Sequence, residues 1–242
     1  KCLGACPEGA ILDDEAGHRI DYAKCTACGV CAEVCRYNAL TRYGMEMSVE
    51  EVFDAVRRDK MFYDTSGGGV PVSGGEPLLQ APFVRELFTL CKNEGIHTCI
   101  ETAGFAPTEN LRMLLPLTDC LLFDLKHMDA DLHYKYTGQS NELILKNAGI
   151  AAENGADILF RIPLIPGVND TPENITQTAE FVKGLPVPPR VQLMPYHRMG
   201  DSKYKALDLP NEMHDVAVMT PAAVEAVCQA FVVRGVDCSI SK

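Results

Sequence analysis

The sequence predicts a parallel α/β fold, either a partial barrel or a doubly wound sheet, together with a small cysteine-rich domain. The first observation is the alternation of short apolar runs with amphipathic helical stretches, because parallel strands need a crossover connection between neighbours. The second is the distribution of cysteine, since six of the eleven cysteines lie within the first 35 residues. We therefore expect two domains, residues 1–43 and residues 44–242.

Composition and charge limit the class of protein. A chain of 242 residues, 47% hydrophobic and 23% charged, can bury one sizeable core and a small satellite. No apolar run approaches the about 18 residues that cross a bilayer, and there is no basic and then apolar leader, so we expect a cytoplasmic protein without a membrane partner. The net charge of −11 would repel phosphate backbones, which argues against a nucleic-acid partner.

The cysteine-rich segment has the spacing of an iron–sulfur protein. In the bacterial ferredoxin run Cys-x2-Cys-x2-Cys-x3-Cys, three thiolates hold one 4Fe-4S cluster and the fourth crosses to a second cluster. The sequence contains one complete run, Cys25, Cys28, Cys31 and Cys35, and the tail of another, Cys2 and Cys6. By the crossing rule, the cluster of the complete run takes Cys6 as its fourth ligand. Cys35 then joins Cys2 at a second cluster, which is two ligands short.

The two cysteine runs are copies of one unit. Residues 6–11 and 35–40 share the order cysteine, three further residues, alanine and an aliphatic residue, with Arg36 in place of the usual proline. A zinc ribbon is the structural alternative, but zinc sites usually place two pairs of ligands around a longer loop. Because the chain opens on lysine, we expect the two missing ligands in a segment upstream of Lys1.

Beyond Tyr43 the expected elements follow in order. A capping box, Ser48 with Glu51, starts a helix over residues 48–58. Thr171-Pro172 and Thr220-Pro221 mark two further helix starts, each with a capping hydroxyl before a proline. The apolar runs predict strands at 69–73, 96–101, 119–125, 157–163 and 190–194. The amphipathic stretches predict helices at 81–94, 107–116, 140–154, 171–184 and 220–234.

Polar residues follow the predicted strands. The first strand runs into Gly74, Gly75 and Glu76, where the glycines let the backbone approach a ligand and the carboxylate suits a cation. Later strands deliver further polar side chains, Glu101, Asp124, Lys126, Arg161 and His197. Ligands of parallel α/β proteins bind at the carboxyl ends of the strands. Each of these features, taken alone, also has an interpretation without a ligand. The glycines could form an ordinary tight turn, and Asp124 and Lys126 could form only an ion pair with each other. Arg161 could be a surface residue at the edge of the sheet, and His197 could be packed in the core.

These motifs, in this order, resemble the glycyl-radical-enzyme activating enzymes, which are radical S-adenosylmethionine (SAM) proteins. The resemblance covers essentially the whole chain. Besides the ferredoxin run it rests on segments 73–77, 101–105, 124–126, 136–138, 161–167 and 193–197. It is strongest for the branch with a ferredoxin-like insert, whose members activate decarboxylases, diol dehydratases and related lyases. The barrel is similar to that of pyruvate formate-lyase activating enzyme, which lacks the insert.

The resemblance implies a fold and a reaction. The fold is a partial parallel (β/α) barrel of radical-SAM type, lacking its first strand in this chain, with a small ferredoxin-like iron–sulfur domain. In the reaction, SAM binds a further 4Fe-4S cluster that is held by three cysteines. One electron then cleaves SAM to a 5′-deoxyadenosyl radical. That radical takes a hydrogen from a glycine of the partner glycyl radical enzyme. A flavodoxin or ferredoxin-type protein is the implied electron donor, and the ferredoxin-like clusters either relay electrons or serve a structural role.

The resemblance also implies roles for the residues at the strand ends. The implied cofactor-binding residues are Ser73, Gly74, Gly75, Glu76, Glu101, Lys126, Arg161 and His197. Among them, Glu76 lies where the family receives the methionyl ammonium of SAM. Lys126 lies where it contacts the methionyl carboxylate. Asp124 and Lys126 are the implied catalytic residues.

One part of the family pattern is absent. The family holds its open-site cluster with Cys-x3-Cys-x2-Cys on the first strand, and the printed sequence has no such run. We expect that segment upstream of Lys1, so that residues 1–242 alone would not support radical chemistry. Pro71, inside a strand expected to be buried, is a smaller departure, because proline lacks a donor for the ladder.

The remaining cysteines and histidines receive no role. We expect buried thiols at Cys91, Cys99, Cys120, Cys228 and Cys238, and packing or surface positions for His127, His133 and His214. Two other functions stay open. One is an electron carrier whose barrel is only a docking scaffold, and the other is a radical SAM enzyme acting on a small molecule or on anaerobic ribonucleotide reductase. The convergent polar residues favour an enzyme over a scaffold.

Overall fold

The computed structural model describes residues 2–13, 20–211 and 213–241. The chain forms two compact units, one of residues 1–47 with 201–211 and one of residues 48–200 with 212–242. Residues 14–19 of the expected cysteine-rich domain lie outside the described residues. The described elements of the first unit are short: the 3-10 helix η1 (Leu3–Ala5), α1 (Val30–Glu33) and α9 (Asp201–Ala206). An antiparallel bridge joins Ile11 to Ile20.

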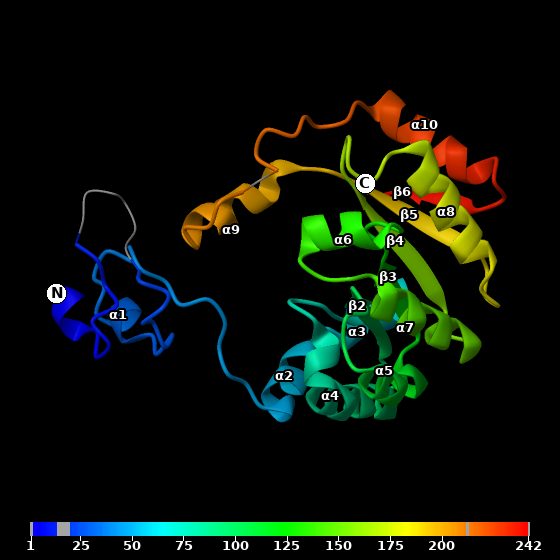
Figure 1. Cartoon of the computed structure of the whole chain (residues 1–242). Coiled ribbons are helices and arrows are strands. Elements are labelled where there is room, and N and C mark those ends of the chain that lie inside the picture. Colours follow the sequence, from blue (N-terminus) through cyan, green and yellow to red (C-terminus); the bar gives the residue numbers. More distant parts are fainter. Residues whose placement is uncertain (1, 14–19, 212, 242) are drawn as a thin grey trace. The chain divides into compact units, whose positions relative to one another are not determined.

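The second unit is built on a parallel sheet (Figure 1). Its strands are β1 (Gly69–Val72), β2 (His97–Thr102), β3 (Cys120–Asp124), β4 (Ile158–Leu164), β5 (Arg190–Pro195) and β6 (Asp237–Ile240). The strands lie in the order in which they occur along the chain, and each neighbouring pair is parallel. A doubly wound sheet instead reverses its strand order at a switch point. The uninterrupted order of the described strands therefore confirms the partial barrel.

Helices form most of the connections between the strands. They are α2 (Val49–Arg57), α3 (Lys60–Ser66), α4 (Ala81–Asn93), α5 (Thr108–Leu114), α6 (Ala130–Thr137), α7 (Glu142–Glu153), α8 (Pro172–Lys183) and α10 (Pro221–Val232), with 3-10 turns η2 (Pro77–Gln80), η3 (Leu115–Leu117) and η4 (Arg198–Gly200). The predicted capping box is confirmed, because Ser48 and Glu51 exchange hydrogen bonds of 2.7 and 3.2 Å. Thr171 and Thr220 cap α8 and α10 as predicted.

The sequence pattern did not predict α1, α3, α6, α9 and β6. Helix α6 is short and rich in polar residues, so it has no clear apolar face. It begins where the Asp129 side chain accepts a hydrogen bond from the Leu132 N–H, and it ends at Gly138, whose φ is 75°. Strand β6 alternates exposed and half-buried residues and therefore shows no continuous apolar run.

The sheet has one fully buried apolar face and one half-buried face that carries the charged residues, which we call the polar face. Alternate residues are fully buried, among them Phe123 and Phe160, whose rings meet edge to face with centroids 6.0 Å apart. Burying a side chain of this kind contributes about 1.5–3 kcal/mol. Between these positions lie half-buried polar residues, Glu101, Asp124 and Arg161. Because successive side chains of a strand point to opposite faces, the same segments supply the core and the polar face.

The proline in β1 is accounted for by its position. Strand β1 is an edge of the described sheet, and Pro71 is exposed. Proline is tolerated on edge strands, where a missing donor costs no ladder hydrogen bond. The strand was expected to be buried, but within the described sheet Pro71 is exposed on an edge strand.

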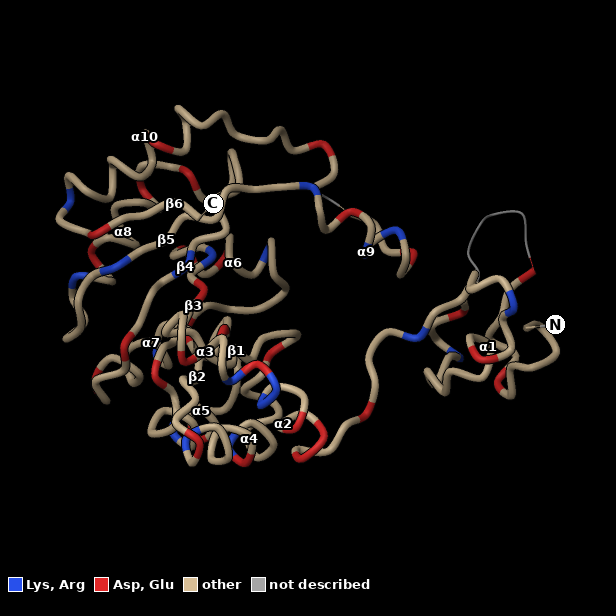
Figure 2. Tube along the Cα trace, turned by 180° about the vertical axis from the view of Figure 1, so that it is seen from behind, with Lys and Arg blue, Asp and Glu red and all other residues tan. Residues whose placement is uncertain are grey.

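The helix surfaces carry charges of both signs. Figure 2 shows acidic and basic residues interspersed around helices such as α4.

Among the described residues, no helix combines the length and the apolar character needed to cross a bilayer.

Candidate functional site

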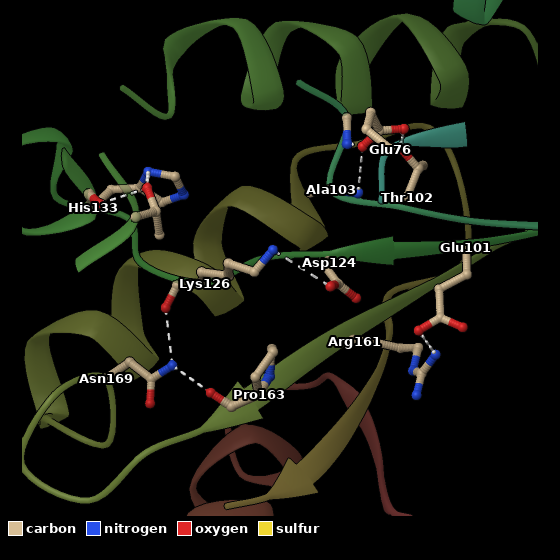
Figure 3. A network of polar contacts seen from close by, with 12 residues as sticks. Glu76, Glu101, Thr102, Ala103, Asp124, Lys126, His133, Arg161, Pro163 and Asn169 are labelled. Atoms are coloured by element: carbon tan, nitrogen blue, oxygen red, sulfur yellow. Dashed lines mark hydrogen bonds and ion pairs between the residues drawn. The ribbon is translucent and has the colours of Figure 1, made fainter. Parts of the chain in front are cut away.

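The loop after β1 is held by the carboxylate of Glu76. Its Oε1 accepts hydrogen bonds from Thr102 Oγ1 at 2.6 Å and from the Leu78 N–H at 3.1 Å, and its Oε2 accepts one from the Ala103 N–H at 3.1 Å. Figure 3 shows the side chain turned toward Thr102 and Ala103. Both carboxylate oxygens are therefore used to join the end of β1 to the end of β2.

Two glycines shape this part of the site. Gly74 has a φ of 126°, in a region that residues with a Cβ rarely adopt. Gly104 has a φ of 74°, and a Cβ at this position would overlap the ring of Phe123. The Gly104 N–H donates to Thr102 Oγ1 at 2.8 Å, which continues the Glu76 network. The loops after β1 and β2 thus depend on each other for their shape.

Four charged side chains meet on the polar face of the sheet (Figure 3). Arg161 Nη1 lies 2.7 Å from Glu101 Oε1, and Lys126 Nζ lies 3.6 Å from Asp124 Oδ2. Asp124 and Arg161 are partners in register across β3 and β4. The structure therefore brings together acidic and basic residues from three neighbouring strands.

The Asp124 carboxyl is the most constrained member of this group. Burial raises its pKa, and the positive charges of Lys126 and Arg161 oppose that rise without cancelling it. Its Oδ1 and the Arg161 Nε are buried without a hydrogen-bond partner among the described residues. A ligand that carries both an ammonium and a carboxylate, as an amino acid does, has the charges to pair with this group.

Not every predicted residue joins this group. His197 follows β5 and is exposed, and its Nδ1 accepts a hydrogen bond from the Met199 N–H at 3.4 Å. Ser73 and Gly75 are exposed on the loop that Glu76 holds. No contact within the described part of the chain joins His197 to the Asp124–Lys126 pair.

The sequence analysis missed the buried asparagines that hold the strand-end loops. Asn141, Asn147, Asn169 and Asn174 are each at most 4% exposed. Asn147, for example, donates to the carbonyls of Gly104 and Ala106 at 2.8 and 2.9 Å. A sequence signal exists for Asn169, which follows the Pro166-Gly167 turn. Asparagine is usually exposed, so none of the four was expected in the interior.

The two cysteine runs of the first unit share local geometry. The Ala10 N–H donates to Cys6 Sγ at 3.3 Å, and the Ala39 N–H donates to Cys35 Sγ at 3.2 Å. The preceding residues have left-handed φ values in both copies, 59° at Gly9 and 50° at Asn38. Equivalent turns therefore place backbone donors on a cysteine sulfur in both copies.

Four of the six cysteines line one cavity of the first unit. The cavity has a volume of 380 Å³, and its cysteines are Cys6, Cys25, Cys28 and Cys31. These are the four assigned to one cluster by the ferredoxin spacing. Among the described residues, no three His, Cys, Asp or Glu side chains converge tightly enough to hold a single metal ion. Thiolates arranged around a cavity suit a polyatomic cluster better than one zinc ion, whose sulfur ligands meet at about 2.3 Å.

The thiolate form of Cys35 is favoured by its surroundings. Backbone N–H groups of Leu40, Tyr37 and Ala39 lower the pKa of this thiol. Neither Cys35 nor Cys2 lines the cavity of the other four cysteines.

The remaining cysteines are less buried than expected. Cys91 and Cys228 are buried, but Cys99, Cys120 and Cys238 are only half-buried. Cys99 and Cys120 are partners in register across β2 and β3. A hydrogen bond between the two thiols lowers the pKa of Cys120 to about 7 and raises that of Cys99. The prediction of buried thiols is therefore wrong for three of the five.

The chain matches a family model described as the radical SAM superfamily over residues 23–182. A curated relative, the (2S)-3-sulfopropanediol dehydratase activating enzyme of Klebsiella oxytoca, is 41% identical and aligns with 99% of this chain and 78% of its own length. The trans-4-hydroxy-L-proline dehydratase activating enzyme of Clostridioides difficile is 42% identical over 84% of this chain and 68% of its own length.

A solved structure has a similar fold. It is a domain of pyruvate-formate lyase-activating enzyme from Bacteroides vulgatus, with a TM-score of 0.62 and 32% identity. The similarity covers 72% of this chain and 99% of that domain. The sequence relatives and the solved domain thus point to the same group of activating enzymes.

Proposed function

The chain belongs to the radical SAM superfamily as a glycyl-radical-enzyme activating enzyme, and we propose that the polar residues at the carboxyl ends of β1 to β5 bind its SAM. The observation that carries this proposal is the meeting of Glu101, Asp124, Lys126 and Arg161 on one face of the sheet. An amino-acid moiety such as the methionyl part of SAM matches both signs of charge. The loop at Gly74 and Gly75 offers backbone groups beside them.

The charged residues divide between the two ends of the methionyl group. Asp124 and Glu101 face its ammonium, because Asp124 Oδ1 is buried and unpartnered among the described residues. Lys126 neutralises the carboxylate, with His197 approaching from the loop after β5. Arg161 holds the Glu101 side chain in place through their 2.7 Å ion pair. Asp124 and Lys126 thereby fix the sulfonium end of SAM toward the reacting glycine.

Glu76 acts through the loop rather than by touching the ligand. Its carboxylate was expected to receive the methionyl ammonium, yet both oxygens already accept hydrogen bonds from Thr102, Leu78 and Ala103. Three of the about four acceptor sites of this carboxylate are therefore occupied by groups of the chain itself. Glu76 therefore holds Gly74 and Gly75 in position for SAM.

The reductive step needs a cluster that this stretch of chain does not supply. In the superfamily, an open-site 4Fe-4S cluster would supply the electron for the reductive cleavage of SAM. The printed sequence has no Cys-x3-Cys-x2-Cys run, so we assign none of its cysteines to that cluster. What the described residues contribute is the binding and orientation of SAM.

We assign the cysteine-rich unit to two further clusters. Cys6, Cys25, Cys28 and Cys31 are the ligands of one, supported by their common cavity. Cys2 and Cys35 contribute to the other. The two clusters would either relay electrons from a flavodoxin or ferredoxin-type donor toward SAM or serve a structural role. Because iron–sulfur clusters and eleven cysteines outside disulfides suit a reducing compartment, we place the protein in the cytoplasm.

The partner is a glycyl radical enzyme. The relatives named above activate dehydratases that act on a sulfonated diol and on a hydroxylated amino acid. We propose that the partner of this chain belongs to the same group of dehydratases and lyases, acting on a small polar substrate.

The test is reductive SAM cleavage by the complete protein, reconstituted anaerobically with all of its clusters. Incubation with SAM and dithionite should release 5′-deoxyadenosine, and adding the partner enzyme should give a glycyl radical signal by electron paramagnetic resonance. Lys126→Ala should raise the KM for SAM, whereas the exposed Lys183→Ala should not. Equal kinetics for the two variants would reject the proposed site, and absence of 5′-deoxyadenosine would favour an electron carrier.

A further inference from the structure

The segment that carries Lys126 is held by asparagine side chains instead of by secondary structure. Strand β3 ends at Asp124, and α6 begins only at Ala130. Between them, the carbonyls of Lys126, His127 and Met128 all accept hydrogen bonds from asparagine amides, at 2.7–3.0 Å. Buried backbone groups without a partner are costly, so these amides take the place of a sheet or helix ladder.

Asn169 makes the contact nearest to the proposed SAM residues (Figure 3). Its Nδ2 donates to the Lys126 carbonyl at 2.9 Å and to the Pro163 carbonyl at 2.7 Å. Its Oδ1 accepts from the Ile165 N–H at 2.8 Å. The residue is 3% exposed. One side chain thus ties the end of β3 to the end of β4, with both amide protons used.

A second buried asparagine holds Asn169 itself. Asn174 is 4% exposed, and its Nδ2 donates to the Asn169 carbonyl at 2.9 Å while its Oδ1 accepts from the Met128 N–H at 2.9 Å. Thr171 caps α8, the helix that carries Asn174. The position of the Lys126 backbone is therefore set from the first turn of α8.

The Lys126 ammonium group is held by a long ion pair. The side chain is 36% exposed, and its ion-pair partner Asp124 lies at 3.6 Å. Since this ion pair is longer than a normal hydrogen bond, the direction of the side chain also depends on the backbone from which it starts. Displacing that backbone would displace the charge offered to SAM.

We propose that Asn169 is a positioning residue, which fixes the Lys126 backbone so that its ammonium group meets the methionyl carboxylate of SAM. This inference rests on the proposed role of Lys126. Asn169 does not touch SAM in this account, so it acts through Lys126 alone. Its effect on SAM binding must then disappear when the Lys126 ammonium group is absent.

A double-mutant cycle tests this dependence. The dissociation constant of SAM is measured without reductant on the reconstituted holoenzyme, for Asn169→Ala in the Lys126 and in the Lys126→Ala backgrounds. We expect Asn169→Ala to weaken binding about 10-fold with Lys126 present and less than about 2-fold with Lys126→Ala. Thermal unfolding measured on the same proteins separates a loss of folding from a loss of binding.

Asn147 provides the matched control. It is fully buried, donates to the carbonyls of Gly104 and Ala106, and accepts from Thr108 Oγ1, so it has the same number of hydrogen bonds as Asn169. It holds the loop after β2 instead of the Lys126 segment. Asn147→Ala should therefore change the SAM dissociation constant by the same factor in both backgrounds.

The outcomes are distinct. If Asn169→Ala weakens binding equally in both backgrounds, its role is structural and the inference is wrong. If Lys126→Ala alone leaves SAM binding unchanged, the proposed role of Lys126 fails as well. Asn169→Ser, which keeps one hydroxyl donor and disturbs the fold less, is measured in parallel. A SAM affinity of Asn169→Ser between those of the unchanged protein and Asn169→Ala, seen only when Lys126 is present, would support the inference. A SAM affinity of Asn169→Ser equal to that of the unchanged protein would overturn it.

Discussion

Replacing Glu76 by alanine should destabilise the barrel as well as weaken SAM binding. The carboxylate accepts hydrogen bonds from the Thr102 hydroxyl and from the N–H groups of Leu78 and Ala103. A hydrogen bond to a charged group contributes about 1.5–3 kcal/mol. Because Glu76 is only half-buried, water can replace part of this, and we expect a loss of about 3 kcal/mol, equivalent to two bonds at the lower value.

Thermal and urea unfolding measure this loss. In a domain of this size, about 3 kcal/mol corresponds to a melting temperature about 6–12 °C lower. Glu76→Gln keeps one oxygen acceptor and should lose about half as much. Glu86→Ala, on the exposed face of α4, should stay within about 0.5 kcal/mol of the unchanged protein.

The same variants separate two roles for the carboxylate. If Glu76 holds the loop, stability and SAM affinity fall together in Glu76→Ala, and the iron content is unchanged. If Glu76→Ala unfolds at the same urea concentration as the unchanged protein but no longer binds SAM, the carboxylate meets the ligand directly. That result would refute the loop role derived from its three hydrogen bonds.

Three further predictions follow from burial, thiol chemistry and cysteine spacing. Burial raises the pKa of the Asp124 carboxyl in the folded state. Between the ordinary and the raised pKa the folded form binds more protons than the unfolded form, so the free energy of unfolding falls as the pH rises through that window. Asp124→Asn should therefore unfold at a higher urea concentration than the unchanged protein at pH 7, while its rate of SAM cleavage falls. The Cys120 thiol, whose pKa is lowered to about 7 by its hydrogen bond with Cys99, should react with iodoacetamide with a midpoint near pH 7, and Cys99→Ser should move that midpoint upward. Cys28→Ser should lower the iron and sulfide content of anaerobically prepared protein by about one 4Fe-4S cluster. Cys91 is fully buried, and Cys91→Ser should leave that content unchanged. Zinc without iron in the unchanged protein would contradict the cluster assignment.

Much of the fold could be predicted because its signals are local. The capping box at Ser48 and the hydroxyl caps at Thr171 and Thr220 each involve residues within one helical turn. The alternation of apolar runs and helices predicted the strands from β1 to β5. Strand β6 could not be predicted in the same way, because it alternates exposed and half-buried residues and is recognised only by its pairing with β5.

The polar residues at the strand ends could also be named from the sequence, but their contacts could not. The sequence placed Glu76, Asp124 and Lys126 at strand ends, where parallel α/β proteins bind ligands. It could not indicate that Glu76 turns to Thr102, which is 26 residues away. Whether a carboxylate meets a ligand or a backbone N–H depends on the neighbouring strand, and that strand is positioned by the whole sheet.

The sequence by itself therefore determined the spacing of the cysteines, the period of the strands and helices, and the residue types at the strand ends. Only the tertiary structure decided which of these groups are free. It paired Glu101 with Arg161, left Asp124 Oδ1 buried without a partner among the described residues, and brought Asn169 to the Lys126 carbonyl across 43 residues. Ligand spacing and periodicity are properties of a few adjacent residues. Burial and hydrogen-bond partnership arise only when distant segments pack together and exclude water.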